Sequence, residues 1–179
     1  MTKPGYPNIK AVLILSVGFY VLFIAFFASA NSASKALREA GYSNLGFYSL
    51  AVLYLFFSLS SFFTPLLIQK WEPKWSMVIA SLTYALWIIT LALTSLVLKN
   101  DSLKNWFSYE SVYCIVILAS VINGAGCSLL WIAQGKYLSD SAMLCLERKG
   151  TYNSIFWTTM LSAQFSSSIL NAYVLGEFP

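Results

Sequence analysis

The chain has 179 residues, of which 58% are hydrophobic and only 10% are charged, and its formal net charge is +4. This composition excludes an ordinary soluble domain, in which about 25% of residues are charged, and it indicates a multi-pass integral membrane protein with the lipid bilayer as its surroundings. The eleven basic residues are dispersed between apolar runs rather than gathered in a patch. We therefore expect no nucleic-acid partner.

The sequence contains no histidine, and its three cysteines, Cys114, Cys127 and Cys145, form no C-x-x-C pair. The commonest proton relay and the commonest metal ligand are thus absent, and so is any Ser-His-Asp or Cys-His arrangement. No glycine-rich phosphate loop follows a predicted strand. We expect the protein not to be an enzyme, with no catalytic residue, no cofactor and no metal site.

Long apolar runs without charged side chains predict the architecture. At about 1.5 Å rise per residue, a helix of some 20 residues crosses a hydrocarbon core of about 30 Å. The sequence therefore predicts an all-α fold, with one transmembrane domain over residues 1–179. The five predicted transmembrane helices cover residues 11–31, 44–69, 75–98, 112–134 and 151–175.

The first run has a rival interpretation as a cleaved signal peptide, since Ala28-Ser29-Ala30 has the small-x-small form of a cleavage site. We favour a retained helix because the run is longer than the usual apolar part of a signal peptide. Ala25, Ser29 and Ala33 also continue a strip of small residues past that point, as a packed helix would.

The second run contains Pro65, which we expect to end the helix or bend it, because proline cannot donate a backbone hydrogen bond. The fourth run carries Ser120, Gly124 and Ser128 at intervals of four residues. This spacing predicts a strip almost without side chains, against which another helix can pack closely.

The fifth run carries Ser154, Thr158, Ser162 and Ser166, again four residues apart. This hydroxyl stripe has two interpretations. Small hydroxyl residues favour close helix packing, and they can also line a polar cavity. We favour packing.

Basic residues at the ends of the runs predict the orientation of the chain in the membrane. Seven lie at the amino terminus and in the second and fourth connectors, and four lie on the other side. The positive-inside rule places the side that carries the seven basic residues in the cytosol, or in the matrix or stroma of an organelle. The seven are Lys3, Lys10, Lys70, Lys74, Lys136, Arg148 and Lys149, and the four are Lys35, Arg38, Lys99 and Lys104.

Several motifs resemble the Unc-ninety-three-like family of the major facilitator superfamily. They are W131-I-A-Q-G-K-Y-L138 after a glycine-rich helical turn, N153-S-I-F-W157, A30-N-S-A33 and Y54-L-F-F-S-L-S-S-F-F-T-P65. The resemblance implies an incomplete amino-terminal half of a protein built from repeated six-helix halves. Major facilitators usually carry an acidic residue in the second connector, near the position where this chain has Gln69.

Two functions follow from these observations. The preferred one is an accessory, structural or regulatory subunit held in a larger membrane complex, with transmembrane helices of a different protein favoured as partners over copies of this chain. The alternative is a transporter of a small, neutral solute, complete only as an oligomer or with a second half. Its polar cavity would be lined by Asn31, Asn123, Gln134 and Gln164, since a primary amide facing lipid lacks hydrogen-bond partners.

Overall fold

A computed structural model describes residues 8–39, 41–99, 107–143, 146–174 and 176. These residues form helices and contain no strand. Lys3, Lys104 and Cys145, which the sequence analysis named, lie outside them. The elements are α1 (Ile9–Glu39), α2 (Leu45–Ser61), α3 (Thr64–Lys70), α4 (Pro73–Lys99), α6 (Tyr109–Ala142), the 3-10 turn η1 (Leu146–Arg148) and α7 (Lys149–Val174).

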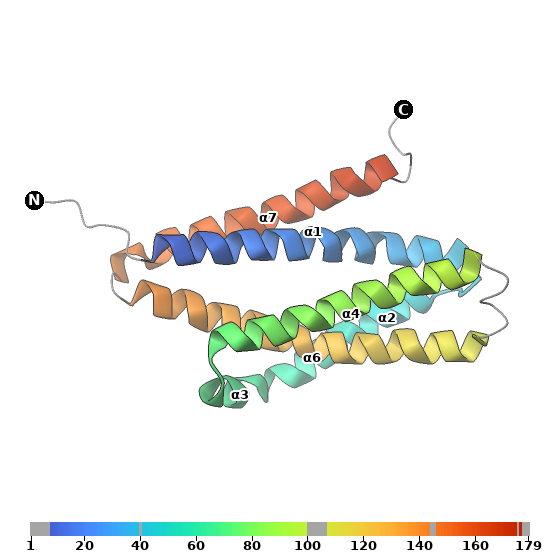
Figure 1. Ribbon diagram of the computed structural model, residues 1–179, viewed down its shortest axis with the longest axis horizontal. Helices are drawn as coiled ribbons and strands as arrows, with labels where there is room; N and C mark the ends of the chain where they lie inside the picture. Colours follow the sequence, from blue (N-terminus) through green and yellow to red (C-terminus); the bar gives the residue numbers. More distant parts are fainter. Residues whose placement is uncertain (1–7, 40, 100–106, 144–145, 175, 177–179) are drawn as a thin grey trace, which may run out of the picture.

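Helices α1, α2, α4, α6 and α7 run back and forth along one axis, so that each is antiparallel to the one before it (Figure 1). α6 packs against α2 on one side and against α4 on another. α1 and α7, the first and last of these helices, lie side by side and run in the same direction. One end of the bundle therefore contains the beginnings of α1, α4 and α7 and the ends of α2 and α6.

The prediction of an all-α, multi-pass membrane protein is confirmed. Within the described residues, α1, α4 and α6 are each long and apolar enough to cross a membrane, and α2 with α3 qualifies as one bent span. The predicted number of five spans is approximate, because α7 is not among these helices. α7 has 26 residues, but its many hydroxyl and amide side chains make it less apolar than the others.

The second predicted span is bent by 59° between α2 and α3. Pro65 lies in the first turn of α3, where its missing N–H has no intrahelical role. Proline cannot donate to the carbonyl of Ser61 four residues earlier, so the hydrogen-bond ladder of α2 cannot continue through it. The hydroxyl of Thr64 donates to the carbonyl oxygen of Ser60 (2.9 Å) across the break.

Aromatic rings from α1, α4 and α7 form the core on one side of α6. Phe23 and Phe26 of α1 contact the ring of Tyr84 on α4, with centroids 5.5 and 5.1 Å apart. Phe19, one turn earlier on α1, packs edge-on against Phe156 of α7 at 5.0 Å. Such edge-to-face pairs are favourable beyond the area they bury, and here they hold three helices together.

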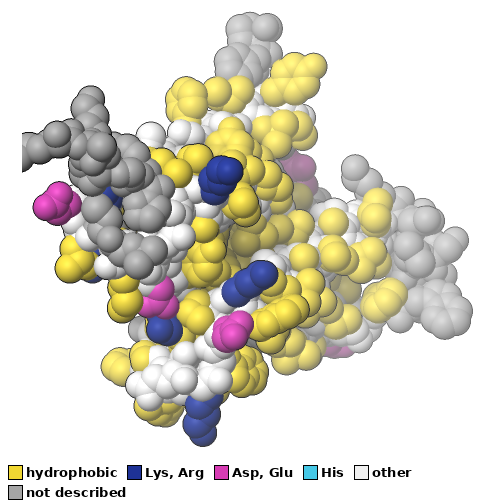
Figure 2. Space-filling model, turned by 60° about the vertical axis from the view of Figure 1, so that its left-hand side comes forward, with side chains coloured by type: hydrophobic (Ala, Val, Ile, Leu, Met, Phe, Trp, Pro, Cys, Tyr) yellow, Lys and Arg dark blue, Asp and Glu magenta, His cyan; other side chains and the backbone are white. Residues whose placement is uncertain are grey.

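Charged side chains lie mainly at the ends of the bundle, as the space-filling view shows for the end that comes forward (Figure 2). The flanks behind this end are largely hydrophobic. Lys136 and Asp140, near the end of α6, form an ion pair there at 3.2 Å. An apolar flank between charged ends is the distribution that a bilayer requires.

Candidate functional site

The strip of small residues on α6, called here the α6 seam (Ser120, Gly124 and Ser128), lies against α2 and α3. The hydroxyl of Ser120 contacts the hydroxyl of Ser49 on α2 (2.9 Å). Ser128 contacts the hydroxyl of Thr64 on α3. Because Thr64 already donates to a backbone carbonyl, Ser128 is the donor in that pair. The seam therefore joins α6 to both parts of the bent span.

Ser120 is fully buried and uses its whole hydrogen-bonding capacity. Its hydroxyl donates to the carbonyl oxygen of Val116 (2.8 Å) and accepts from the indole Nε1 of Trp87 on α4 (3.1 Å). The hydroxyl of Ser49 supplies the second accepted bond. A hydroxyl has one donor and two acceptor sites, so one buried oxygen links α2, α4 and α6.

Three glycines mark the closest approaches between helices. A Cβ built at Gly124 would lie 2.5 Å from the carbonyl oxygen of Leu53, and one built at Gly46 would lie 2.6 Å from the Cα of Ser34. At Gly126 the Thr83 hydroxyl of α4 occupies the place of a Cβ. The sequence analysis did not single out Gly46 as a packing residue. Its position inside an apolar run is the only feature of the sequence that could have indicated this role.

The strip of small residues predicted on α1 is not buried along its whole length. Ala33 is buried and Ser29 is half-buried, but Ala25 is exposed. The helix instead buries Phe19 and Phe23, on the face that meets the aromatic core. At Gly46, where α1 and α2 are in close contact, the α1 residue is Ser34, one residue beyond the strip.

The hydroxyl stripe of α7 faces away from the rest of this chain. Ser154, Thr158 and Ser162 are exposed. Ser166 is half-buried and its hydroxyl lies 2.9 Å from that of Tyr20 on α1. A different face of α7 is buried, and it consists of Tyr152, Phe156, Met160, Ala163 and Ser167.

The structure does not bring the four amides together. Asn31 is exposed on α1 and Gln164 is exposed on α7, whereas Asn123 and Gln134 are buried on α6. Asn123 accepts a hydrogen bond from the Thr83 hydroxyl of α4 at 3.3 Å, and its Nδ2 has no partner among the described residues. Asn123 and Gln134 are eleven residues apart on α6, about 16 Å along the helix, and Asn31 and Gln164 are on two other helices with their side chains exposed.

Gln164 lines a cavity of about 360 Å³ whose other walls are mostly aromatic and aliphatic. The rings of Tyr84 and Trp131 form part of these walls, and none of the described residues that line the cavity is charged. Trp131 stacks on Trp157 of α7, with ring centroids 5.7 Å apart and planes 11° apart. The two motifs that carried the family resemblance in α6 and α7 therefore meet at this cavity.

Taken together, the apolar spans, the buried α6 seam and the charged ends define a multi-pass helical membrane protein. Among the described residues, no group of three carboxylate or thiol side chains could hold a metal ion. A family model described as "Ion channel regulatory protein UNC-93" matches residues 38–177. The chain belongs to this UNC-93 family, which confirms the resemblance found in its motifs.

The relatives include animal and plant proteins. Protein unc-93 homolog A of Bos taurus is 33% identical across 96% of this chain and 35% of its own length. UNC93-like protein MFSD11 of Xenopus laevis is 29% identical across 96% of this chain and 34% of its own, and UNC93-like protein 3 of Arabidopsis thaliana is 25% identical across 98% and 35%. The chain thus spans about a third of these relatives' length. No solved structure matches.

Proposed function

We propose that this chain is a non-enzymatic accessory or regulatory subunit of a larger membrane assembly, in which helices of a different protein cover α7. The observations that carry the proposal are the exposed hydroxyl stripe of α7, formed by Ser154, Thr158 and Ser162, and the exposed amide of Gln164 on another face of the same helix. The description of the UNC-93 family as ion channel regulatory proteins supports the regulatory role.

The exposed hydroxyls of α7 tolerate lipid better than the exposed amide of Gln164 does. Ser154 and Ser162 donate to the carbonyl oxygens of Gly150 and Thr158 on their own helix (2.9 and 2.8 Å). The side chain of Gln164 has two donors and an acceptor, and hydrocarbon satisfies none of them, at a cost of several kcal/mol. A neighbouring helix with polar side chains satisfies them.

The hydroxyl stripe of α7 also suits an association that can be regulated. Small hydroxyl residues allow two helix backbones to come close, so that packing and hydrogen bonds act together. Individual hydrogen bonds between transmembrane helices contribute only about 0.6 kcal/mol on average. When an interface consists of many weak contacts of this kind, a small change in the conformation of the partner changes the fraction of chains that are bound.

Site-specific photo-crosslinking tests this proposal. A photoreactive side chain replaces Thr158 on the hydroxyl stripe or, as a matched control, Leu82, which is 64% exposed on α4. We expect position 158 to crosslink to one different membrane protein in native membranes, and position 82 to crosslink to lipid. The variant Ser162→Leu should reduce the crosslink from position 158 and alter the activity of the captured protein.

Two outcomes would contradict the subunit proposal. Crosslinking of position 158 to lipid alone, in a protein that remains folded, would leave α7 without a protein partner. Crosslinking to a second copy of this chain would replace the hetero-complex by a homo-oligomer.

The cavity beside Gln164 supports the alternative, a carrier of a small neutral solute. Its aromatic walls can hold an apolar surface, and the amide of Gln164 can orient a polar group. Among the described residues that line it, none is charged and able to pair with an ion. Uptake of a neutral solute into liposomes by the purified chain, abolished by Gln164→Leu, would establish the carrier. The subunit proposal predicts that the chain alone transports nothing.

A further inference from the structure

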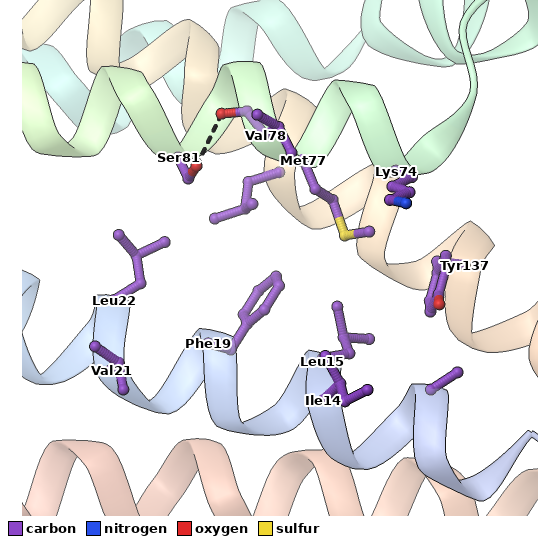
Figure 3. Close-up of a pocket in the computed structure, with 13 residues that line it drawn as sticks. Ile14, Leu15, Phe19, Val21, Leu22, Lys74, Met77, Val78, Ser81 and Tyr137 are labelled. Carbon is purple, nitrogen blue, oxygen red and sulfur yellow. Dashed lines mark hydrogen bonds between the residues drawn. The ribbon is translucent and has the colours of Figure 1, made fainter.

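A groove of about 720 Å³ runs between α1 and α4 on a flank of the bundle. Its walls are almost entirely apolar, with Leu15 and Leu22 on α1 and Met77 on α4 (Figure 3). Lys74 and Tyr137 lie together at one end of it. The groove is therefore apolar along most of its length, interrupted by the hydroxyl of Ser81, and its charged residue Lys74 lies at one end.

The polar end continues into a second cavity, of about 360 Å³, which shares Lys74 and Tyr137 with the groove. Glu72 and Asp140 also line this second cavity. Its lining residues come from the beginnings of α1 and α4 and from the end of α6. These segments lie together at the charged end of the bundle (Figures 1 and 2). A cation and two carboxylates thus stand at the boundary between the apolar flank and water.

The charges at this boundary are only partly neutralised by one another. Asp140 forms an ion pair with Lys136 at 3.2 Å. Lys74 and Glu72 are exposed, and neither forms an ion pair within the part of the chain that the structure describes. Lys74 and Glu72 are therefore available to bind a ligand that carries both a negative and a positive group.

We propose that the groove binds one acyl chain of a glycerophospholipid of the ethanolamine type, with its phosphate at Lys74 and Tyr137 and its ammonium group at Glu72. The length of the groove fits this occupant. Its α1 wall extends from Ala11 to Leu22, about 16 Å along the helix. The hydrocarbon of one leaflet is about 15 Å thick, half of a core of about 30 Å, so an acyl chain with its headgroup at Lys74 fills the groove.

Gly18 keeps the middle of the groove open. It lines the groove, and a Cβ built on it would meet no atom within 4 Å. A large side chain at this position would occupy the acyl-chain site without disturbing a packed helix. Gly135 on α6 is equally open and lies outside both cavities, which makes it a matched control.

Lipid retention tests the proposal. The full chain is placed in discs that contain equal amounts of phosphatidylcholine, phosphatidylethanolamine and phosphatidylglycerol, and the lipid that remains after transfer to detergent is identified by native mass spectrometry. We expect one phosphatidylethanolamine to be retained in preference to the other two. Gly18→Leu should abolish this retention, while Gly135→Leu should leave it unchanged.

The headgroup contact is tested separately. Lys74→Gln should lower retention about two- to fivefold, the effect of losing one exposed ion pair. Lys70→Gln removes a nearby exposed charge outside both cavities and should have no effect. Equal retention of all three lipids, a preference for phosphatidylglycerol, or retention that survives Gly18→Leu would each overturn the proposal. So would a photo-crosslink from position 18 to a protein instead of lipid.

Discussion

Helix α6 approaches α2 so closely at Gly124 that a Cβ built there would lie 2.5 Å from the carbonyl oxygen of Leu53. The obstacle is backbone, which cannot rotate away as a flexible side chain can. Any larger residue at position 124 must therefore move one of the two helices. Because Ser120 and Ser128 lie on either side of Gly124 in the α6 seam, such a movement would also affect their contacts with α2 and α3.

We predict that Gly124→Leu lowers the yield of folded protein, because it separates α6 from α2. Overpacking of a well-packed core typically costs about 1–3 kcal/mol, and here the hydrogen bonds of the seam weaken as well. Fluorescence-detected size-exclusion chromatography of detergent extracts measures the monodisperse fraction. Gly135→Leu, at an open position of the same helix, is the control. Equal yields of the two variants would show that the approach at Gly124 contributes little.

A second prediction concerns the shared hydroxyl of Ser120. In Ser120→Ala the indole of Trp87 and the hydroxyl of Ser49 lose their buried acceptor, and each unsatisfied group costs about 1–3 kcal/mol. Unfolding of the purified protein in mixed micelles, followed by tryptophan fluorescence, should show a clear loss of stability.

Ser162→Ala serves as the comparison for that measurement. Ser162 is exposed and donates only to the carbonyl oxygen of Thr158 on its own helix. We expect its replacement to change the stability of the isolated chain by less than about 0.5 kcal/mol. If the two alanine variants unfold alike, the hydrogen bonds converging on Ser120 do not stabilise the bundle.

The arrangement of the helices predicts which connectors share a side of the membrane. In a variant without native cysteines, single thiols are introduced at Glu72, Glu147 and Ser43. A thiol reagent that does not cross the bilayer should label positions 72 and 147 from the same side, and position 43 from the other. The positive-inside rule places the shared side in the cytosol, matrix or stroma. Labelling of Glu72 and Glu147 from opposite sides would mean that α4 and α6 do not both cross the bilayer.

The sequence predicts the helices well because the physical constraint is local. Charged side chains are costly in hydrocarbon, so each uncharged run lies largely within helix, although α1 and α6 each continue eight residues past the predicted end. Pro65 likewise marks the bend, since the hydrogen bond that it cannot donate belongs to its own segment. The size of the bend could not be predicted, because it also depends on the contact of Thr64 with Ser128 on α6.

Which face of a helix meets which neighbour was harder to predict. A spacing of four residues places Ser154 and Thr158 on one face of α7, but it does not state what that face contacts. Here the packing of Phe156 against Phe19 turns α7 so that the hydroxyls point outward. Asn123 and Gln164 are separated for the same reason, since the relative rotation of α6 and α7 is set by long-range contacts that single-helix periodicity does not contain.

The pairing of α1 with α7 also imposes an order on the biogenesis of the protein. Phe19 meets Phe156 only after about 140 further residues have been synthesised, which takes roughly 7 to 30 s at 5–20 residues per second. During that interval the aromatic face of α1 lies in the membrane without its partner from α7. Lipid, the insertion machinery or a membrane chaperone must cover it. The nascent chain is therefore most vulnerable to misassembly and to quality-control proteolysis just before α7 enters the bilayer.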